Sequence, residues 1–365
     1  MLGIRVSKLL PRLNVRSCEN IRDRAWFCSS SQPGKFAVVS LYHLDKIDKV
    51  EDVVRDVRTW LEEVGATGRV YFNRQGVNCQ MCLRSDKLET FKDVLGNNLG
   101  LDNIKAKVHF ADFNVFRKLR VRHGKLLENL NDNSDISLRG EHLDRTEWNK
   151  VLEEEPDSLI LDIRNGYEWD VGRFKGAERP RYRKFSEFGE MADDVVERVK
   201  DKKQKVLMYC TGGIRCEVFS SLLIKRGLKE VYQLKDGVLG YGEGSVEDTR
   251  HWEGNLFVFD DRLVVPIDGS IGGEKDKPVS ICRHCGVIAD MVYNCNSLQC
   301  NQVHISCMQC AVTMKGCCSP ECRDMTAHHF VARNSRQWPK GVKGGKMIGR
   351  GELYREWVSS MSHCE

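Results

Sequence analysis

At 365 residues the chain is long enough for two or three domains. Hydrophobic residues make up 41% of it, and no apolar run approaches the roughly 18 residues that a membrane-spanning helix needs. These features favour a soluble globular protein without a membrane partner. The formal net charge of +5 is modest, so charge alone indicates a polyanionic partner only weakly.

Cysteine is over-represented, with 16 residues, nine of which lie between Cys282 and Cys322. A secreted protein would pair many of them as disulfides. The N-terminus, however, lacks the long apolar core of a secretory signal. We therefore expect metal ligands or catalytic thiols in a reducing compartment.

Residues 1–30 have the pattern of a targeting segment. Basic residues recur there at helical spacing between leucines, without an acid among them: Arg5, Lys8, Arg12 and Arg16. A basic amphipathic helix followed by small polar residues is typical of a mitochondrial presequence. A chloroplast address and a disordered basic tail are the alternatives. The segment predicts a mitochondrial protein.

Strand and helix patterns alternate through residues 36–130. Strands are predicted over 35–44, over two runs within 68–83 and over 104–113, and helices over 50–65 and 87–95. The order βαββαβ predicts a ferredoxin-like α+β domain.

Cys79 and Cys82 have CxxC spacing inside one of the predicted strands. Residues i and i+3 of a strand point to opposite faces, so the two thiols cannot easily share a metal. We interpret them as packing residues.

A basic strip beside aromatic residues spans 112–125. Basic grooves with interleaved aromatics are typical of single-stranded nucleic-acid binding, although plain solvated surface often has the same composition. Four residues of the strip are candidate RNA contacts: Arg117, Lys118, Arg120 and Arg122. A basic tail, 326–365, adds further lysines and arginines.

A polar linker, 131–140, precedes a second pattern, 141–266, in which apolar strands alternate with helices. Strands are predicted over 158–164, 205–210 and 230–237, and helices over 144–155, 193–204 and 217–227. This alternation predicts an open parallel α/β sheet. Chemistry collects in the loops at the carboxyl ends of such strands, and Cys210 ends one of them.

The loop after that strand reads Cys-Thr-Gly-Gly-Ile-Arg. Its members are Cys210, Thr211, Gly212, Gly213, Ile214 and Arg215. Two glycines let several amide N–H groups converge beside a helix N-terminus, which makes an anion cradle. Such a cradle and a nearby cation stabilise a thiolate. The loop therefore predicts a nucleophilic sulfur or persulfide at Cys210, with Arg215 beside it. An incidental structural turn is the alternative.

Two details of the loop narrow its chemistry. Four residues separate Cys210 from Arg215, one fewer than in cysteine-dependent phosphatases, so phosphatase activity is disfavoured. Cys216 follows the loop and has two interpretations. It could resolve an oxidised Cys210 as a disulfide, or it could be a small buried residue.

A Gly-rich linker, 267–280, leads to a Cys-rich module, 281–325. Two CxxC pairs at this separation predict structural zinc bound by Cys282, Cys285, Cys307 and Cys310. A second ion is expected on Cys295, Cys300, Cys322 and either Cys317 or Cys318. His284 and His304 are more simply bystanders, and disulfides or metal-free thiols are the alternatives.

The Cys210 loop resembles that of the rhodanese sulfurtransferases, in which the cysteine carries a persulfide. Residues 159–180 resemble the second hallmark of that fold, with Asp162, Arg164, Glu168, Gly172, Gly176, Ala177 and Pro180. The resemblance implies that Arg164 and Glu168 pin the loop. Thr211 stands where thiosulfate-using members tend to have a basic residue, which puts thiosulfate in doubt.

The order of four motifs extends the resemblance over residues 36–325. A ferredoxin-like domain, the loop, "FVFDDR" (257–262) and the Cys-rich module together resemble the rhodanese-domain tRNA uridine hydroxylases. The resemblance implies oxygen-dependent formation of 5-hydroxyuridine at the tRNA wobble position through Cys210. The sequence holds no flavin, haem or nucleotide-binding motif.

Two other functions are alternatives. A sulfurtransferase would pass sulfane sulfur from a small donor to a thiol acceptor through a Cys210 persulfide. A redox-sensing or RNA-binding scaffold would only keep the shape of the loop. The presence of both Cys210 and Arg215 argues against the scaffold.

Overall fold

The computed structural model describes most of the chain between Gly34 and Met325 and a few positions beyond. The described residues are 34–91, 93, 106–124, 137–182, 187–200, 204–269, 276–325, 328, 342–343 and 346–347. The predicted targeting segment therefore lies outside the described residues, as do most of the basic tail and parts of both predicted linkers.

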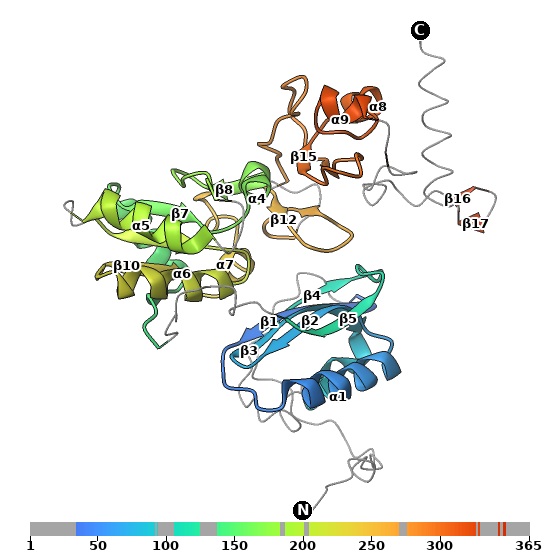
Figure 1. Cartoon of the computed structure of the whole chain (residues 1–365), viewed down its shortest axis with the longest axis horizontal. Coiled ribbons are helices and arrows are strands. Elements are labelled where there is room, and N and C mark those ends of the chain that lie inside the picture. The colour runs from blue at the N-terminus through green and yellow to red at the C-terminus, as the bar shows by residue number, and fades with distance from the viewer. Residues whose placement is uncertain are drawn as a thin grey trace, which may run out of the picture. The chain divides into compact units, whose positions relative to one another are not determined.

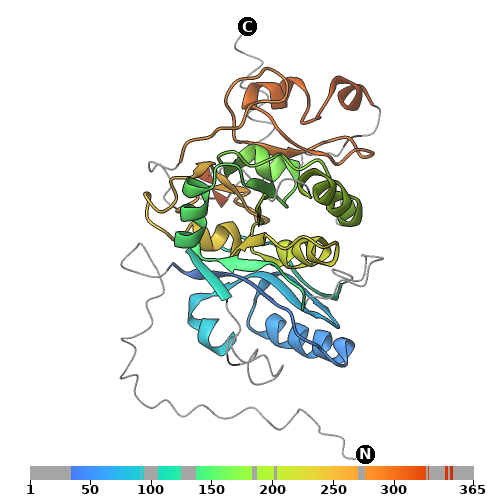
Figure 2. The same ribbon diagram turned by 90° about the vertical axis from the view of Figure 1, so that its left-hand side faces the viewer.

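The N-terminal domain is a sheet with a helix across one face (Figures 1 and 2). Its elements are β1 (Phe36–His43), α1 (Val50–Glu63), β2 (Thr67–Asn73), β3 (Gly76–Arg84), the 3-10 turn η2 (Ser85–Lys87), β4 (Ala106–Ala111) and β5 (Leu119–His123). The strand order is β4-β1-β3-β2-β5, with β5 parallel to β2 and the other pairs antiparallel. The ferredoxin-like prediction is confirmed, with one added strand.

Strand β5 was not predicted, because its alternation of charged and apolar residues was interpreted as a solvated strip. Leu119 and Val121 point into the core, whereas Arg120 and Arg122 are exposed. The alternation is that of a half-buried edge strand.

Cys79 and Cys82 are both buried, on opposite faces of β3. Cys79 packs in the core under α1, and Cys82 packs with Val38 and Val115 on the other side. The interpretation as packing residues agrees with this placement.

The second domain has a four-stranded parallel sheet of order β6-β10-β9-β7. Its elements are β6 (Glu141–Leu143), α3 (Arg145–Glu154), β7 (Leu159–Asp162), α4 (Gly166–Val171), β8 (Gly172–Phe174), α5 (Phe188–Val199), β9 (Val206–Tyr209), α6 (Ile214–Lys225), β10 (Val231–Leu234) and α7 (Gly237–Tyr241). The predicted parallel sheet is confirmed.

Strand β9 is buried on both faces, which explains its continuous apolar sequence. Val206 and Met208 pack with α5 and α6, whereas Leu207 and Tyr209 pack in a second core around Trp148 and Phe174. The strand therefore holds the residue that follows it, Cys210, in the centre of the domain.

Short strands lead from this domain into the Cys-rich module. They are β11 (Trp252–Gly254), β12 (Leu256–Phe257) and β13 (Val264–Val265), followed by β14 (Val292–Asn294), β15 (Val303–Ile305), α8 (Met308–Thr313) and α9 (Pro320–Asp324). A further hairpin consists of β16 (Val342–Lys343) and β17 (Lys346–Met347). One core cluster joins Val171 of α4 to Val292 and Ile305 of the module.

None of the helices in the described part of the chain is long and apolar enough to cross a membrane.

Candidate active site and metal centres

Cys210 lies between the end of β9 and the start of α6, and it is completely buried. The backbone N–H of Gly213 donates a hydrogen bond of 3.0 Å to the Cys210 Sγ. Gly213 has φ of 99°, a conformation that side chains other than glycine rarely adopt. This glycine lets the chain turn so that the loop amide of Gly213 faces the sulfur.

Helix α7 packs against the loop and forms hydrogen bonds with its backbone. The N–H groups of Val238 and Leu239 donate to the carbonyls of Cys210 and Thr211 at 2.9 and 3.0 Å. A Cβ at Gly237 would lie 2.6 Å from the Cys210 carbonyl oxygen, so only glycine permits this approach. Because the Cys210 and Thr211 carbonyls are bonded to α7, the amide N–H groups on the opposite side of the loop are available to the sulfur.

Glu168 of α4 is the anchor of the loop. Its buried carboxylate accepts from Arg215 Nη1 and Nη2 at 3.0 and 3.1 Å and from the Thr211 hydroxyl at 2.9 Å. Burial raises the pKa of Glu168, but the charge and hydrogen bonds of Arg215 outweigh it and lower the pKa to about 2. Arg215 is thereby fixed beside the sulfur.

Arg164 has a different role from the one that the resemblance implied. It is buried and pairs with Asp162, with Nη2–Oδ2 at 2.6 Å, and it also donates to the Gly172 carbonyl at 2.6 Å. It braces the end of β7, so that of these two residues it is Glu168 that binds the loop.

The two thiols of the site differ in acidity. Burial raises the pKa of Cys210, but hydrogen bonds from the Cys216 thiol and from loop amides, with the Arg215 charge, lower it to about 6. Burial and the neighbouring Cys210 raise the pKa of Cys216 well above its usual range. A thiolate at Cys210 beside a neutral thiol at Cys216 is therefore the favoured pair near neutral pH.

The N-terminal domain contributes two residues that sequence analysis missed. A Cβ at Gly212 would lie 3.9 Å from Ser40 Oγ, and one at Gly213 would lie 2.7 Å from Tyr42 Oη. Both neighbours come from one face of β1. Only their alternation in a predicted strand hinted at a shared face, and nothing in the sequence connects that face to the loop.

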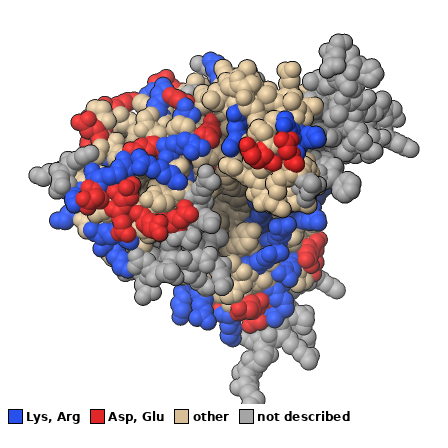
Figure 3. Space-filling view, turned by 45° about the horizontal axis from the view of Figure 1, so that its top comes forward, with Lys and Arg blue, Asp and Glu red and all other residues tan. Residues whose placement is uncertain are grey.

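The four candidate RNA contacts, Arg117, Lys118, Arg120 and Arg122, are all exposed. Register places Arg120 beside Arg69 and Arg122 beside Tyr71 on the sheet face that lacks α1. Arg117 pairs with Asp261 at 3.0 Å, so part of its charge is neutralised. Figure 3 shows Lys and Arg side chains gathered beside a hollow on the face in view.

The "FVFDDR" motif (257–262) joins this sheet to the rest of the chain. Arg69 Nη1 donates to the Phe259 carbonyl at 3.3 Å, and the N–H of Asp261 donates to the Val115 carbonyl at 2.8 Å.

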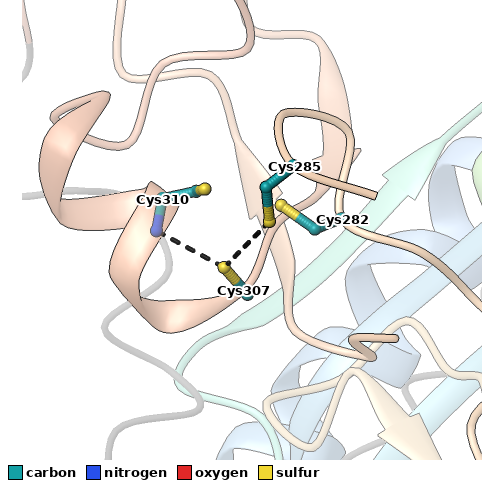
Figure 4. A group of neighbouring side chains, drawn as sticks. All are labelled: Cys282, Cys285, Cys307 and Cys310. Carbon is teal, nitrogen blue, oxygen red and sulfur yellow. Dashed lines mark hydrogen bonds between the residues drawn. The ribbon is translucent and has the colours of Figure 1, made fainter. Parts of the chain in front are cut away.

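The first predicted metal set converges in space. The Sγ atoms of Cys282, Cys285, Cys307 and Cys310 lie within 4.8 Å of one another (Figure 4). The Sγ atoms of Cys285 and Cys307 are 3.7 Å apart. In a tetrahedral site with Zn–S bonds of about 2.3 Å, the sulfur atoms are separated by about 3.8 Å. Four thiolates in this arrangement fit a structural zinc ion.

The second set resolves a choice that the sequence left open. Cys295, Cys300, Cys318 and Cys322 form the group, with Cys318 at 3.7 Å from Cys300 and 3.8 Å from Cys322. Cys317 is buried and directs its thiol to the Lys315 carbonyl, 3.8 Å away. Both groups contain only cysteines, so neither His284 nor His304 belongs to them.

The parallel sheet and the cysteine loop between β9 and α6 define a rhodanese-type domain. Residues 145–243 match the family described as Rhodanese-like domain, residues 253–323 match Rhodanase C-terminal, and residues 36–126 match UPF0176 acylphosphatase like domain.

The whole arrangement is shared with named relatives. The tRNA uridine(34) hydroxylase of Protochlamydia amoebophila is 37% identical over 80% of this chain and 90% of its own length. That of Chlamydia felis is 38% identical over 79% of this chain and 87% of its own. The chain belongs to the tRNA uridine(34) hydroxylase family.

The comparisons correct the predicted localisation. The relatives, from Protochlamydia and several Chlamydia species, are bacterial proteins. They contradict the mitochondrial prediction and its chloroplast alternative, which rested only on the basic amphipathic pattern of residues 1–30. That pattern is an arrangement of charges and leucines, which is no proof of an organellar address.

Proposed function

We propose that this protein is an enzyme that hydroxylates uridine 34 of tRNA, with Cys210 as its central thiol. Membership of the family supports the reaction, and it favours a hydroxylase over the sulfurtransferase alternative. The observation that supports the site is the buried, acidified thiol of Cys210 in a loop whose Arg215 is fixed by Glu168.

Thr211 further disfavours thiosulfate as a substrate. Its hydroxyl is occupied by Glu168 at 2.9 Å and by Arg215 Nη2 at 2.9 Å. The position supplies no cation to a dianionic sulfur donor, so one guanidinium would have to neutralise the whole anion.

Cys216 is proposed as the resolving thiol. Insertion of one atom of O₂ at C5 of uridine, with the other leaving as water, consumes two electrons and two protons. Oxidation of the Cys210 thiolate and the Cys216 thiol to a disulfide supplies both electrons and one proton, and solvent supplies the second proton. The hydrogen bond from the Cys216 thiol to the Cys210 sulfur supports this pairing.

The basic face of the N-terminal sheet is proposed to contact tRNA. Arg120 and Arg122 are exposed there, and Ser40 and Tyr42 on the same sheet lie against the Cys210 loop. Phosphates bound on this face would be close to the loop. Zinc in the two cysteine sites would be structural, because four thiolates leave no open coordination position.

The test is nucleoside mass spectrometry of tRNA from a bacterial strain that lacks its own uridine(34) hydroxylase. We expect the native chain to restore 5-hydroxyuridine and Cys210→Ser to fail. Cys79→Ala, which removes a buried packing thiol, is the matched control and should restore the nucleoside. If the native chain leaves the tRNA unchanged, the proposal is wrong, and sulfur transfer from thiosulfate becomes the activity to assay.

A further inference from the structure

A groove of about 950 Å³ lies between helix α4 and the Cys-rich module. One wall consists of residues 165–173 and 179–181, and the other of residues 279–283 and 301–305. Its volume is at the upper end of the usual range for ligand sites, about 300–1,000 Å³, so an extended ligand fits.

Both walls of the groove contain arginines. Arg173, Arg179 and Arg181 line one wall and Arg283 the other, whereas Asp170 is the only acidic residue in the lining among those that the structure describes. Asp170 pairs with Arg179 at 2.8 Å. Arg181 and Arg283 are exposed, and neither forms an ion pair within the described residues. Two guanidinium groups on facing walls are thus available to an anion.

An aromatic platform accompanies the charge. The Arg173 guanidinium lies over the Trp169 ring, 4.0 Å from its centroid, and pairs weakly with Glu253 at 3.6 Å. A stacked guanidinium keeps its N–H edge free for bidentate contact with phosphate oxygens. Arginines beside aromatic rings are the features of grooves that bind single-stranded nucleic acid.

A buried polar side chain also lines the groove. His304 is 4% exposed, and its ring nitrogens have only the backbones of Gln302 and Tyr293 as internal partners, neither with full hydrogen-bond geometry. Buried polar groups are normally well bonded, so an imidazole with poorly aligned internal partners at a groove wall has hydrogen-bonding capacity to offer a ligand. A neutral imidazole can donate to one group and accept from another, as a ribose 2′-hydroxyl or a base edge requires.

The groove is directly connected to the Cys210 loop. Asn165, in its wall, donates its N–H to Glu168 at 2.9 Å, and Glu168 binds Thr211 and Arg215. We infer that the groove binds the single-stranded sugar–phosphate backbone of the tRNA anticodon loop, next to the uridine held at Cys210. This inference rests on the proposed function and assigns its substrate a second surface, separate from β5.

The test measures binding of a fluorescein-labelled anticodon stem-loop RNA to the full-length, zinc-loaded protein by anisotropy over a series of salt concentrations. The R181A/R283A variant should bind at least tenfold more weakly at low salt. Its slope of log K against log[salt] should be shallower by about 1.4–1.8, the change expected for two lost phosphate contacts. R181K/R283K should recover most of the affinity.

His304→Ala should weaken binding by about fivefold at every salt concentration with the slope unchanged, because a neutral hydrogen bond releases no counterions. R55A/R84A, which removes two exposed arginines from α1 and from the end of β3, is the matched control and should bind as the native protein does. Zinc content and the unfolding midpoint establish that each variant is folded.

An unchanged affinity and slope for R181A/R283A would overturn the inference. So would competition by polyglutamate as strong as by the RNA, because the groove would then be a site for an acidic peptide. Both results would leave the hydroxylase proposal intact if the native protein still forms 5-hydroxyuridine. Conversely, RNA binding that depends on the groove without 5-hydroxyuridine would refute only the proposed reaction.

Discussion

Tyr42 donates a hydrogen bond of 3.1 Å from its Oη to Oε1 of Glu217. Tyr42 belongs to β1 of the N-terminal domain, and Glu217 lies in the first turn of α6, directly after the Cys210 loop. The Glu217 carboxylate is buried and is also bonded to His142 at 3.0 Å and Gln233 at 3.3 Å. The N-terminal domain is therefore bonded to the helix that carries the active loop.

Tyr42→Phe should lower hydroxylation about fivefold and destabilise the protein by about 1.5–3 kcal/mol, the contribution of one hydrogen bond to a charged acceptor. Glu217 keeps its hydrogen bonds with His142 and Gln233 and its ion pair with Arg139, so the protein should still fold. Urea unfolding and tRNA hydroxylation by the purified protein measure the two effects. Tyr71→Phe, on the same sheet face, is the control, and an equal loss in both variants would refute a specific role for Tyr42.

Gly213→Ala should abolish activity, whereas Gly227→Ala should not. Both glycines have positive φ, 99° and 95°, so each alanine should cost about 1–2 kcal/mol in backbone strain. The Gly213 Cβ would meet Tyr42 Oη at 2.7 Å, while nothing lies within 4 Å at Gly227. Unfolding and hydroxylation assays separate the shared strain from the clash. Full activity of Gly213→Ala would show that the contact with Tyr42 is unimportant.

The Cys210 thiol should titrate near pH 6, as measured by the difference in ultraviolet thiolate absorbance between the native protein and Cys210→Ser. Arg215→Gln should raise that pKa, and Arg226→Gln, whose partner is Asp193, should leave it unchanged. Because the folded-state pKa lies below the ordinary 9.0, the thiolate stabilises the fold fully above pH 9 and progressively less down to pH 6. The stability advantage over Cys210→Ser should therefore increase from pH 6 to 9, and a pH-independent difference would contradict the assignment.

Glu168→Gln should destabilise the protein by about 3 kcal/mol, because it removes the buried carboxylate that pairs with the partly buried guanidinium of Arg215. Asp170→Asn breaks the half-exposed pair with Arg179 and should cost at most about 1 kcal/mol. The pKa of Glu168, about 2, lies below its ordinary 4.5, so its contribution is complete above pH 4.5 and is lost as the pH falls toward 2. Denaturant unfolding at several pH values measures the free energy of unfolding of each variant. An equal loss of stability in Glu168→Gln and Asp170→Asn would contradict the role assigned to Glu168.

The metal sites distinguish two adjacent cysteines. Cys318→Ser should lose one of two bound zinc ions, whereas Cys317→Ser should keep both, because only Cys318 belongs to a four-sulfur group. Inductively coupled plasma mass spectrometry of the purified protein gives the zinc content. Chelation of the metal should unfold the module, whose own hydrophobic core is small. Loss of zinc from Cys317→Ser alone would reverse the assignment.

Much of the fold follows from local patterns. The apolar run of β9 and the helical periodicity on either side of it predict a parallel α/β sheet. The loop that contains Cys210, Gly213 and Arg215 predicts an anion cradle. The spacing of the cysteines predicts two metal sites and most of their ligands. Strand β5 was not predicted, because its arginines were interpreted as a charged surface strip and the alternation of apolar and charged residues was overlooked.

The sequence by itself determined the kinds of element and their order, and it predicted the reactive thiol and the metal-binding character of the Cys-rich module, because each depends on residues a few positions apart. Only the tertiary structure decided that Glu168 binds Arg215, that Tyr42 lies over Gly213, that Cys318 rather than Cys317 joins a metal set, and that Arg181 and Arg283 line one groove. Apart from the choice between two adjacent cysteines, these contacts join residues separated by many positions in the chain. Periodicity records which face of an element is buried, but the partner of that face is selected by the packing of the whole domain.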